Sequence, residues 1–369
     1  MKNLEKGIEV LKILNSNSFD AFIVGGAVRD YLLGYDSNDI DITTNATYED
    51  ICRIFDNVIN EGQKYLSCRI KFMDIEFEVT TFRRDVEYID HRHPITVKAD
   101  TIFEDLKRRD FTINAFAMNS EYKIIDCFNG VNDLKNHIIK TIGDANTRFN
   151  EDGLRVLRAL YFSSKLNFDL DDDIIKSLDN NHIKYLKQEY IKNMLEKIIS
   201  LKSSKGLEYI FKYDILRTFP FWKELVKDIL NYNCRKNYYA LFLVLNDEFP
   251  QDVLLTRKEI TNAKKIKDLV INDFDDISLF YCDKDNLEAA IYVYNCLNYD
   301  DLSISEINER YNNLKLKSIK DINFDFNILS PNKRSKTMRI VIKEILNGNI
   351  DNNFDSINEF VGCLEWTRI

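Results

Sequence analysis

The sequence of 369 residues lacks the features of a membrane-bound or secreted protein. Its apolar runs fall well short of the roughly 20 residues that a membrane-spanning helix needs. The N-terminal Met-Lys-Asn-Leu has no apolar core of the kind that signal peptides carry. These absences predict a cytoplasmic protein with no membrane segment.

The numbers and positions of the cysteines, prolines and glycines are also informative. The 7 cysteines are scattered, with no Cys-x-x-Cys pair and no histidine spaced to complete a zinc site, so we expect free thiols. Only 4 prolines and 11 glycines occur, and the glycines are concentrated in the first half. The glycine-poor remainder is rich in Leu, Ile, Lys, Asn and Tyr, which suits helices.

A large excess of positive charge is absent too. The formal net charge is -9, whereas a protein that coats nucleic acid by bulk electrostatics needs clustered Lys and Arg. Any RNA site must therefore be a local patch. With 45% hydrophobic residues, the chain can build the cores of two to four ordered domains.

The hydrophobic pattern changes along the chain. Residues 1–18 predict an amphipathic helix with Leu4, Ile8, Leu11 and Val10 on its apolar side. Short β-branched or alternating runs then predict a mixed sheet with flanking helices, at 22–24, 39–42, 68–72, 76–80 and 124–126. After Gly143, helical periodicity dominates, at 152–164, 173–178, 188–200, 205–216 and on to the C-terminus. The expected fold class is α+β, with an all-helical second half.

A pair of glycines follows the first predicted strand. Segment 22–30 is a buried strand that runs through Gly25 and Gly26 into a helix, which Gly34 can end. Such glycines let backbone N–H groups approach a phosphate at a helix N-terminus, and Arg29 can bind a phosphate oxygen. A plain tight turn between strand and helix gives the same pattern.

Two carboxylates follow about ten residues later. Asp39 and Asp41 are two residues apart on a predicted strand, so both point to one face. Two hard oxygen ligands side by side suit Mg²⁺ that carries a nucleotide's phosphates. A solvated strand edge is the alternative, but the preceding glycine turn favours the metal site.

Two-metal phosphoryl transfer commonly uses a further carboxylate. Strand 76–82 offers Glu76 and Glu78 on a common face, and the pattern alone does not choose between them or exclude a solvent-facing role.

Two basic segments come next. Residues 83–98 are polar and charged, and we expect a mobile loop there. Its Arg84 and Arg92 are candidate RNA contacts, and its two histidines lack the partners of a metal site. In 107–115, three cations including Arg109 precede an apolar helix or strand with Asp110 as a candidate cap. These cations could hold a triphosphate or form a solvated charged face.

The helical half opens with residues 151–162. At about 100° per residue, Glu151, Asp152, Arg155 and Arg158 fall within an arc of roughly 120°, opposite Tyr161. An amphipathic helix with ion pairs explains this layout without any function. The functional alternative is that Asp152, as acceptor, and Arg155, as donor, read the edge of a base.

Taken in order, these motifs resemble the series of the class II tRNA CCA-adding enzymes. They are Gly25-Gly26-x-x-Arg29-Asp30, Asp39-x-Asp41, Arg108-Arg109-Asp110-Phe111-Thr112-x-Asn114-Ala115 and Glu151-Asp152-x-x-Arg155. The series covers roughly residues 20–165. It implies a polymerase-β-like head at 1–142, a helical neck at 143–200, a body at 201–280 and a tail at 281–369.

The resemblance also implies roles for single residues. Asp39 and Asp41 would bind two Mg²⁺ ions, with Glu78 as the third carboxylate of the catalytic set. Nucleotide contacts are implied for Gly25, Gly26, Arg29, Arg109, Asp152, Arg155 and Arg158. In the family, the neck selects C or A by hydrogen bonds from protein in place of a nucleic-acid template.

The implied reaction adds C, C and A to the 3′ end of tRNA from CTP and ATP. The segment 85–97, which is shortened in relatives that add only the two cytidines, is retained here. Tyr161 stands where many relatives carry another arginine, which leaves the specificity less defined than the chemistry. In the helical half, Lys333, Arg334 and Lys336 are candidate contacts for the tRNA backbone, or a solvated helix start.

Other activities fit parts of the pattern. They are CC-only or A-only addition to tRNA, a bacterial poly(A) polymerase that shares the head motifs, and a catalytically silent RNA-binding protein on the same fold. The intact Glu151-Asp152-x-x-Arg155 motif and the lack of a long basic tail disfavour the polymerase. The presence of both Asp39 and Asp41 disfavours the silent protein. The sequence carries no signal of oligomeric state.

Overall fold

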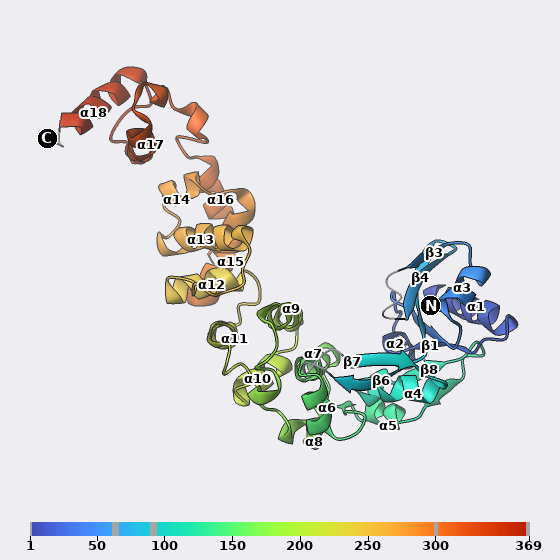
Figure 1. Ribbon diagram of the computed structural model, residues 1–369. Coiled ribbons are helices and arrows are strands. Elements are labelled where there is room, and N and C mark those ends of the chain that lie inside the picture. The colour runs from blue at the N-terminus through green and yellow to red at the C-terminus, as the bar shows by residue number, and fades with distance from the viewer. Residues whose placement is uncertain (1, 61–65, 89–93, 299–301, 367–369) are drawn as a thin grey trace. The chain divides into compact units, whose positions relative to one another are not determined.

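The computed structural model describes residues 2–60, 66–88, 94–298 and 302–366. The chain divides into two compact units, Met1–Lys223 and Glu224–Ile369, coloured blue to green and yellow to red in Figure 1. This boundary falls within the predicted body, and the division into four parts remains a prediction.

A mixed sheet forms the centre of the first half of unit 1. Among the described residues it has seven strands, in the order β3-β4-β5-β2-β1-β8-β9. Strands β2 and β5 run parallel, and the other neighbours run antiparallel. The strand bounds are β1 Ala21–Val24, β2 Asp41–Thr44, β3 Val58–Asn60, β4 Ser67–Phe72, β5 Ile75–Thr81, β8 Phe116–Met118 and β9 Ile124–Asp126. The mixed sheet predicted from the sequence is confirmed.

Helix α1 (Lys2–Ser16) packs against β1, and its apolar side is the one expected from the sequence. Leu4, Ile8, Val10 and Leu11 are all buried. Helix α2 (Gly26–Leu32) ends where Gly34 takes the left-handed conformation at φ 79°. The remaining helices beside the sheet are α3 (Tyr48–Ile54), α4 (Ile102–Lys107) and α5 (Gly130–Lys135).

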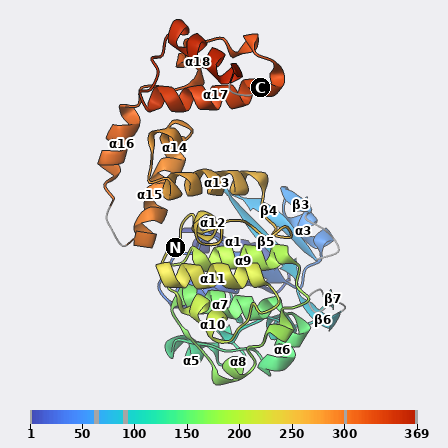
Figure 2. The same cartoon turned by 90° about the vertical axis from the view of Figure 1, so that its left-hand side faces the viewer.

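The rest of unit 1 is helical. Its helices are α6 (Ala145–Glu151), α7 (Leu154–Leu166), α8 (Asp172–Lys176), α9 (Gln188–Ile199), α10 (Lys205–Lys212) and α11 (Pro220–Tyr232), which continues into unit 2. Helices α7, α9 and α10 lie side by side (Figure 2). Gly206 lets α10 approach α7, since a Cβ there would lie 2.6 Å from the carbonyl oxygen of Leu160. One short pairing, β10 (Ile138–Ile139) with β11 (Asp169–Leu170), interrupts the expected all-helical half.

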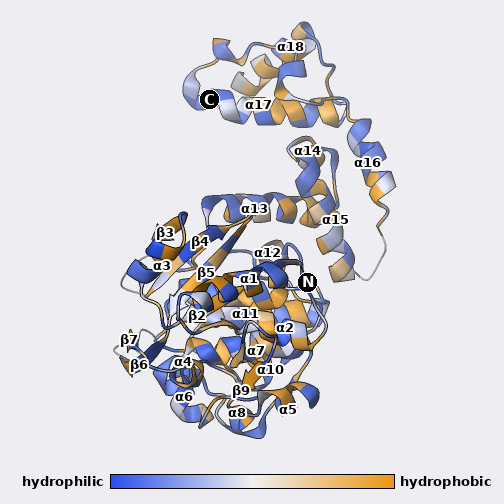
Figure 3. Cartoon of the chain, turned by 90° about the vertical axis from the view of Figure 1, so that its right-hand side faces the viewer, coloured by the Kyte–Doolittle hydropathy of each residue, from blue (hydrophilic) through white to orange (hydrophobic). Residues whose placement is uncertain are grey.

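Unit 2 is built of helices around its own apolar core. They are α12 (Tyr238–Asn246), α13 (Arg257–Ile271), α14 (Asp276–Phe280), α15 (Lys284–Asn298), α16 (Ile304–Asn312), α17 (Pro331–Leu346) and α18 (Phe354–Trp366). Thr256 and Glu259 form a capping box that starts α13. On α17, Val341, Ile342 and Ile345 are buried, and Figure 3 shows that this helix carries both hydrophobic and hydrophilic residues.

Three local expectations were wrong. Within the segment expected to be a loop, β6 (Arg83–Tyr88) and β7 (Pro94–Lys98) form an antiparallel pair whose backbone hydrogen bonds do not depend on side-chain polarity, and 89–93 lie outside the described residues. Asp39 lies just before its strand, since β2 begins at Asp41. Residues 151–162 are not one helix: the chain is extended at Asp152, and Gly153 passes so close to His182 that a Cβ would lie 2.0 Å from its carbonyl oxygen.

No helix in the described part of the chain is both long and apolar enough to cross a membrane. The seven cysteines are thiols and form no disulfide within the described part of the chain, as expected.

Candidate active site

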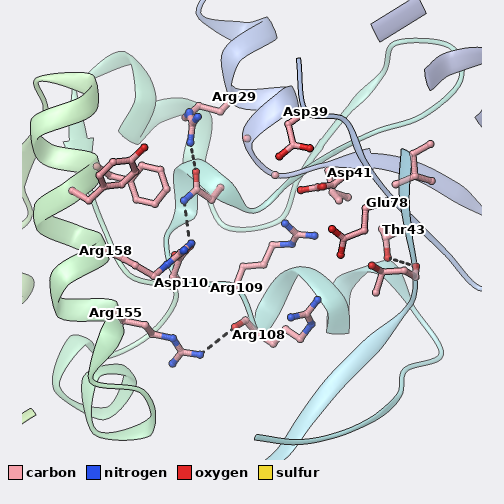
Figure 4. A pocket seen from close by; sticks show the side chains of 18 of the residues that line it. Arg29, Asp39, Asp41, Thr43, Glu78, Arg108, Arg109, Asp110, Arg155 and Arg158 are labelled. Carbon is pink, nitrogen blue, oxygen red and sulfur yellow. Dashed lines mark hydrogen bonds and ion pairs between the residues drawn. The ribbon is translucent and has the colours of Figure 1, made fainter. Parts of the chain in front are cut away.

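A pocket of about 530 Å³ in unit 1 brings the separate motifs together. It is lined from the sheet, the glycine turn, the segment after α4 and helix α7. Its charged lining consists of Arg29, Arg83, Arg108, Arg109, Arg155, Arg158 and Lys165 with Asp39, Asp41, Glu78, Asp110 and Asp152. Gly25 and Gly26 line it as well. Figure 4 shows Asp39, Asp41 and Glu78 on one side, α7 on the other, and Arg109 between them.

Three carboxylates form the acidic side of the pocket. Parallel pairing of β2 with β5 sets Asp41 directly beside Glu78, and Asp39 lies just before β2. Burial, followed by the charges of Asp39 and Glu78, raises the pKa of Asp41 to about 6. Glu76, the other candidate from the sequence, is not in the lining; its carboxylate is half exposed and 3.8 Å from Arg69. The register of β5 thus distinguishes the two glutamates.

The donor set fits a divalent cation that also binds a ligand. Within the described ranges, no three His, Cys, Asp or Glu side chains are gathered as the ligands of one metal ion. Mg²⁺ does not need such a cage, since it takes one or two carboxylates and completes its shell with phosphate oxygens and water. Asp39 and Asp41 can supply that pair, and a bound cation would offset both the burial of Asp41 and the neighbouring charges of Asp39 and Glu78 that raise its pKa.

Gly25 and Arg109 pack against each other at the centre of the pocket. Gly25 has φ 71°, and a Cβ there would lie 2.8 Å from Arg109 Nη1. The guanidinium of Arg109 donates to Asp105 at 3.3 Å, and its buried Nε has no hydrogen-bond partner among the described residues. Burial lowers the pKa of Arg109, while the carboxylates of Asp105 and Asp41 oppose that change. Arg109 is therefore a cation held within the field of the acidic cluster.

A buried chain of polar side chains connects α2 to α7. Arg29 Nη1 donates to Asn114 Oδ1 at 2.6 Å, and Asn114 Nδ2 donates to Asp110 Oδ1 at 3.2 Å. Arg158 Nε then donates to Asp110 Oδ2 at 2.6 Å, while Arg29 also pairs with Asp30. Burial would raise the pKa of Asp110, but the Arg158 charge and the hydrogen bonds hold it below its ordinary value. Asp110 therefore links elements and does not cap a helix by its side chain, contrary to the expectation.

Arg148 is a structural residue that the sequence reasoning missed. Its Nη2 donates to the carbonyl oxygens of Arg108 and Arg109, both at 2.7 Å, and its Nη1 donates to Glu151 at 2.5 Å. Arg155 Nη1 donates to the same Glu151 oxygen at 2.6 Å. The i,i+3 spacing of Arg148 and Glu151 within α6 is the signal in the sequence, because helical neighbours at that spacing meet. Together these contacts hold the backbone that carries Arg109.

Helix α7 lines the pocket over a wider arc than the sequence predicted. Arg155 and Arg158 lie where expected, and Asp152 Oδ1 accepts the Leu154 N–H at 2.9 Å just before the helix. Tyr161 was placed on the opposite side of the helix, which was wrong: it lines the pocket, as do Phe162 and Lys165. Successive positions at i+3 and i+4 keep all of them on one face.

None of the predicted RNA contacts among the described residues is in the lining of this pocket. Arg84 is exposed on β6 with its Nε 3.9 Å from Glu104, and Arg92 lies outside the described residues. In unit 2, Lys333 and Lys336 are exposed near the start of α17. Arg334 instead donates to the carbonyl oxygens of Asn327 and Leu329 at 3.3 Å, so it holds the preceding turn.

Comparison with known proteins identifies the class of the head and then the family. Residues 21–140 match the family described as "Poly A polymerase head domain". The CCA-adding enzyme of Staphylococcus epidermidis is 36% identical over 265 residues, 71% of this chain and 66% of the relative. That of Staphylococcus haemolyticus is 35% identical over 317 residues, 84% of this chain and 78% of the relative. The chain therefore belongs to the class II CCA-adding enzymes, which are tRNA nucleotidyltransferases.

Solved structures share the fold. The crystal structure of the Bacillus stearothermophilus CCA-adding enzyme in complex with CTP has a TM-score of 0.82 at 24% identity, with 98% of each chain covered. The Thermotoga maritima CCA-adding enzyme complexed with tRNA has a TM-score of 0.66 at 20% identity, over 98% of this chain and 95% of that one. The α+β architecture, a mixed-sheet head followed by helices, is thereby confirmed.

Proposed function

We propose that the protein adds C, C and A to the 3′ end of tRNA from CTP and ATP and releases pyrophosphate. The observation that carries the proposal is the lining of the pocket. An acidic cluster lies on one side of the pocket, and arginines and the polar face of a helix lie across from it. The names of its relatives support the same activity, since those proteins are CCA-adding enzymes. A cytoplasmic location is part of this proposal.

In the proposed reaction, Asp39 and Asp41 hold two Mg²⁺ ions with the triphosphate, and Glu78 is the third carboxylate. When bound, the ions promote ionisation of the RNA 3′-hydroxyl and stabilise the negative charge on the departing pyrophosphate. Arg29 and Arg109 bind the phosphates, and the turn at Gly25 and Gly26 leaves room for them. No covalent intermediate is needed, so the protein contributes position and charge.

Base selection is assigned to the start of α7. Asp152 and Arg155 would hydrogen-bond the Watson–Crick edge of C or A, with Arg158 as a further nucleotide contact. Glu151 and the Arg148 carbonyl oxygen hold Arg155 Nη1 at 2.6 and 3.0 Å, so the guanidinium is oriented before a base arrives. A wrong base would leave buried donors or acceptors unpaired, which is the physical basis of discrimination.

Contacts with the tRNA backbone are proposed for Arg84, Arg92, Lys333 and Lys336. Lys333 stands in the first turn of α17, where positive charge opposes the helix dipole at a cost of about 0.3–1 kcal/mol, and Lys336 follows in the next turn. Helix stability does not favour Lys333 there, whereas binding of an anionic partner does. Arg334 contributes by holding the turn that precedes this helix.

The test is to incubate purified protein and Mg²⁺ with tRNA that ends before CCA, after C or after CC. CTP and ATP are supplied singly and together, and the 3′ ends are sequenced. Complete CCA on the shortest tRNA supports the proposal. Addition of CC alone, A alone or a long A tail would instead support CC-only addition, A-only addition or a poly(A) polymerase. No addition would refute the enzyme assignment. A D39N/D41N double variant is the control for contaminating activity.

A further inference from the structure

The pocket face of α7 continues past the residues assigned to the incoming nucleotide. Tyr161, Phe162 and Lys165 line the pocket beyond Arg158, and the proposed reaction so far gives them no role. Tyr161 is half-buried and Lys165 is exposed, so both can meet a ligand, whereas Phe162 is buried.

The three side chains are arranged as a supported aromatic surface. The Tyr161 ring meets the Phe162 ring edge to face, with centroids 5.2 Å apart and an interplanar angle of 64°. Phe162 is itself held by the guanidinium carbons of Arg29 and Arg158, which lie 5.4 and 5.5 Å from its ring centroid. Lys165 Nζ lies 5.8 Å from the centroid of the Tyr161 ring. Tyr161 thus packs on a fixed ring and has the ammonium group of Lys165 over its own ring.

The position along the helix indicates which part of the substrates this surface meets. Arg158 is also assigned to the incoming nucleotide, and from Arg158 to Tyr161 the helix rises about 4.5 Å, at 1.5 Å per residue. Stacked nucleotides follow each other at about 3.4 Å, so Tyr161 lies about one layer beyond a nucleotide held by Arg158. The layer next to the incoming nucleotide in a nucleotidyl transfer is the end of the RNA that attacks it.

We propose that Tyr161 is a stacking platform for the 3′-terminal base of the RNA acceptor and that Lys165 binds the phosphate of that nucleotide. An aromatic face accepts every base because each base has a π-face, which suits an acceptor end that changes after each addition. The cation beside the ring matches the phosphate that accompanies each stacked base. This inference rests on the proposed function, since it names how that site holds its second substrate.

The first test compares the KM for RNA with the KM for CTP. Loss of the ring in Y161A raises the KM for RNA by about 5- to 100-fold, because stacking on an aromatic side chain contributes that much per base. The KM for CTP changes less than twofold, and Y161F retains the wild-type KM for RNA. The control is Y185A, at a tyrosine that is 64% exposed and outside the pocket lining. Equal changes in both KM values, or a Y161F as impaired as Y161A, would overturn the proposal.

The lysine has its own test. K165A lowers the slope of log KM for RNA against log salt by about 0.7, the value for one phosphate contact with a single strand. K176A removes the same charge from an exposed lysine outside the pocket lining and leaves the slope unchanged. An unchanged slope in K165A would remove Lys165 from the RNA site.

A binding experiment separates failure of this inference from failure of the proposed function. A tRNA carrying 2-aminopurine at its 3′ terminus loses fluorescence when that base stacks, without any turnover. Wild type and Y161F quench the probe, whereas Y161A binds the tRNA without quenching it. Quenching that persists in Y161A refutes the platform even if CCA is added. A wild type that adds no nucleotide to any tRNA refutes the function whatever the probe does.

Discussion

Removal of Arg158 should destabilise unit 1 in a way that depends on pH. Asp110 is buried with three partners: the Phe111 N–H at 2.8 Å, Asn114 Nδ2 at 3.2 Å and Arg158 at 2.5–2.6 Å. In R158A the buried carboxylate of Asp110 keeps two neutral hydrogen-bond donors but loses its cationic partner. Removing one partner of a buried ion pair lowers the free energy of unfolding by about 3 kcal/mol. Most of this loss comes from the buried Asp110 carboxylate left without its cation, because Arg158 is itself half-exposed.

The sign of the pH dependence follows from the direction of each pKa shift. In the wild type the folded pKa of Asp110 is lowered, so its contribution is present above the unfolded pKa of about 3.9 and is lost as pH falls through the folded pKa. Without the arginine, burial raises the folded pKa. The destabilisation of R158A is then complete at neutral pH and shrinks as the carboxyl becomes protonated on acidification.

The measurement is urea unfolding of the full chain between pH 4 and 8. Unfolding of unit 1 is monitored by pulsed hydrogen exchange of its peptides. D110N/R158A is the matched control, because a neutral amide needs no counter-ion, and we expect it to regain about 2 kcal/mol at pH 7. An R158A protein as stable as the wild type, or a loss that is equal at pH 4 and pH 8, would refute this account of Asp110.

Four further results are expected at the sites described. G25A places a Cβ 2.8 Å from Arg109 Nη1 at φ 71° and ψ -130°, which only glycine adopts readily, so the KM for CTP should rise and the free energy of unfolding should fall by about 1–3 kcal/mol, as measured by nucleotide titration and thermal melting. D41N should lose about 10³-fold in kcat yet melt at a higher temperature, because a destabilised charge is removed. EDTA should abolish nucleotide addition and Mg²⁺ should restore it, whereas activity that survives chelation would exclude the metal. K333A/K336A should weaken tRNA binding and lower its salt slope by about 1.8, with no loss of thermal stability, in filter binding at several salt concentrations.

The strands around the pocket could be predicted because their local pattern agrees with their burial. Ile23 and Ile42 lie in the core, and the alternation of 76–80 places Phe77 and Val79 inside. The choice of Glu78 over Glu76 could not be made from that alternation, since both share a face. It depends on the parallel register of β5 beside Asp41, which is a long-range contact.

The errors also have long-range causes. The break before α7 coincides with the close approach of Gly153 to the His182 carbonyl, and nothing within 151–162 reveals that neighbour. Tyr161 was assigned to the wrong side because the helix was divided into two faces, whereas the pocket covers a wider arc of it. The role of Arg148 required two carbonyl oxygens about forty positions earlier in the chain, which no local pattern contains.

The side chains that connect α2 to α7 limit how this sequence can evolve. Each of Arg29, Asn114, Asp110 and Arg158 supplies a hydrogen bond or charge that its neighbour in the series needs. A single change strands a polar group in the interior, whereas a compensated pair of changes does not. We expect these positions to covary among relatives, so that a departure at one of them identifies where a second should be found.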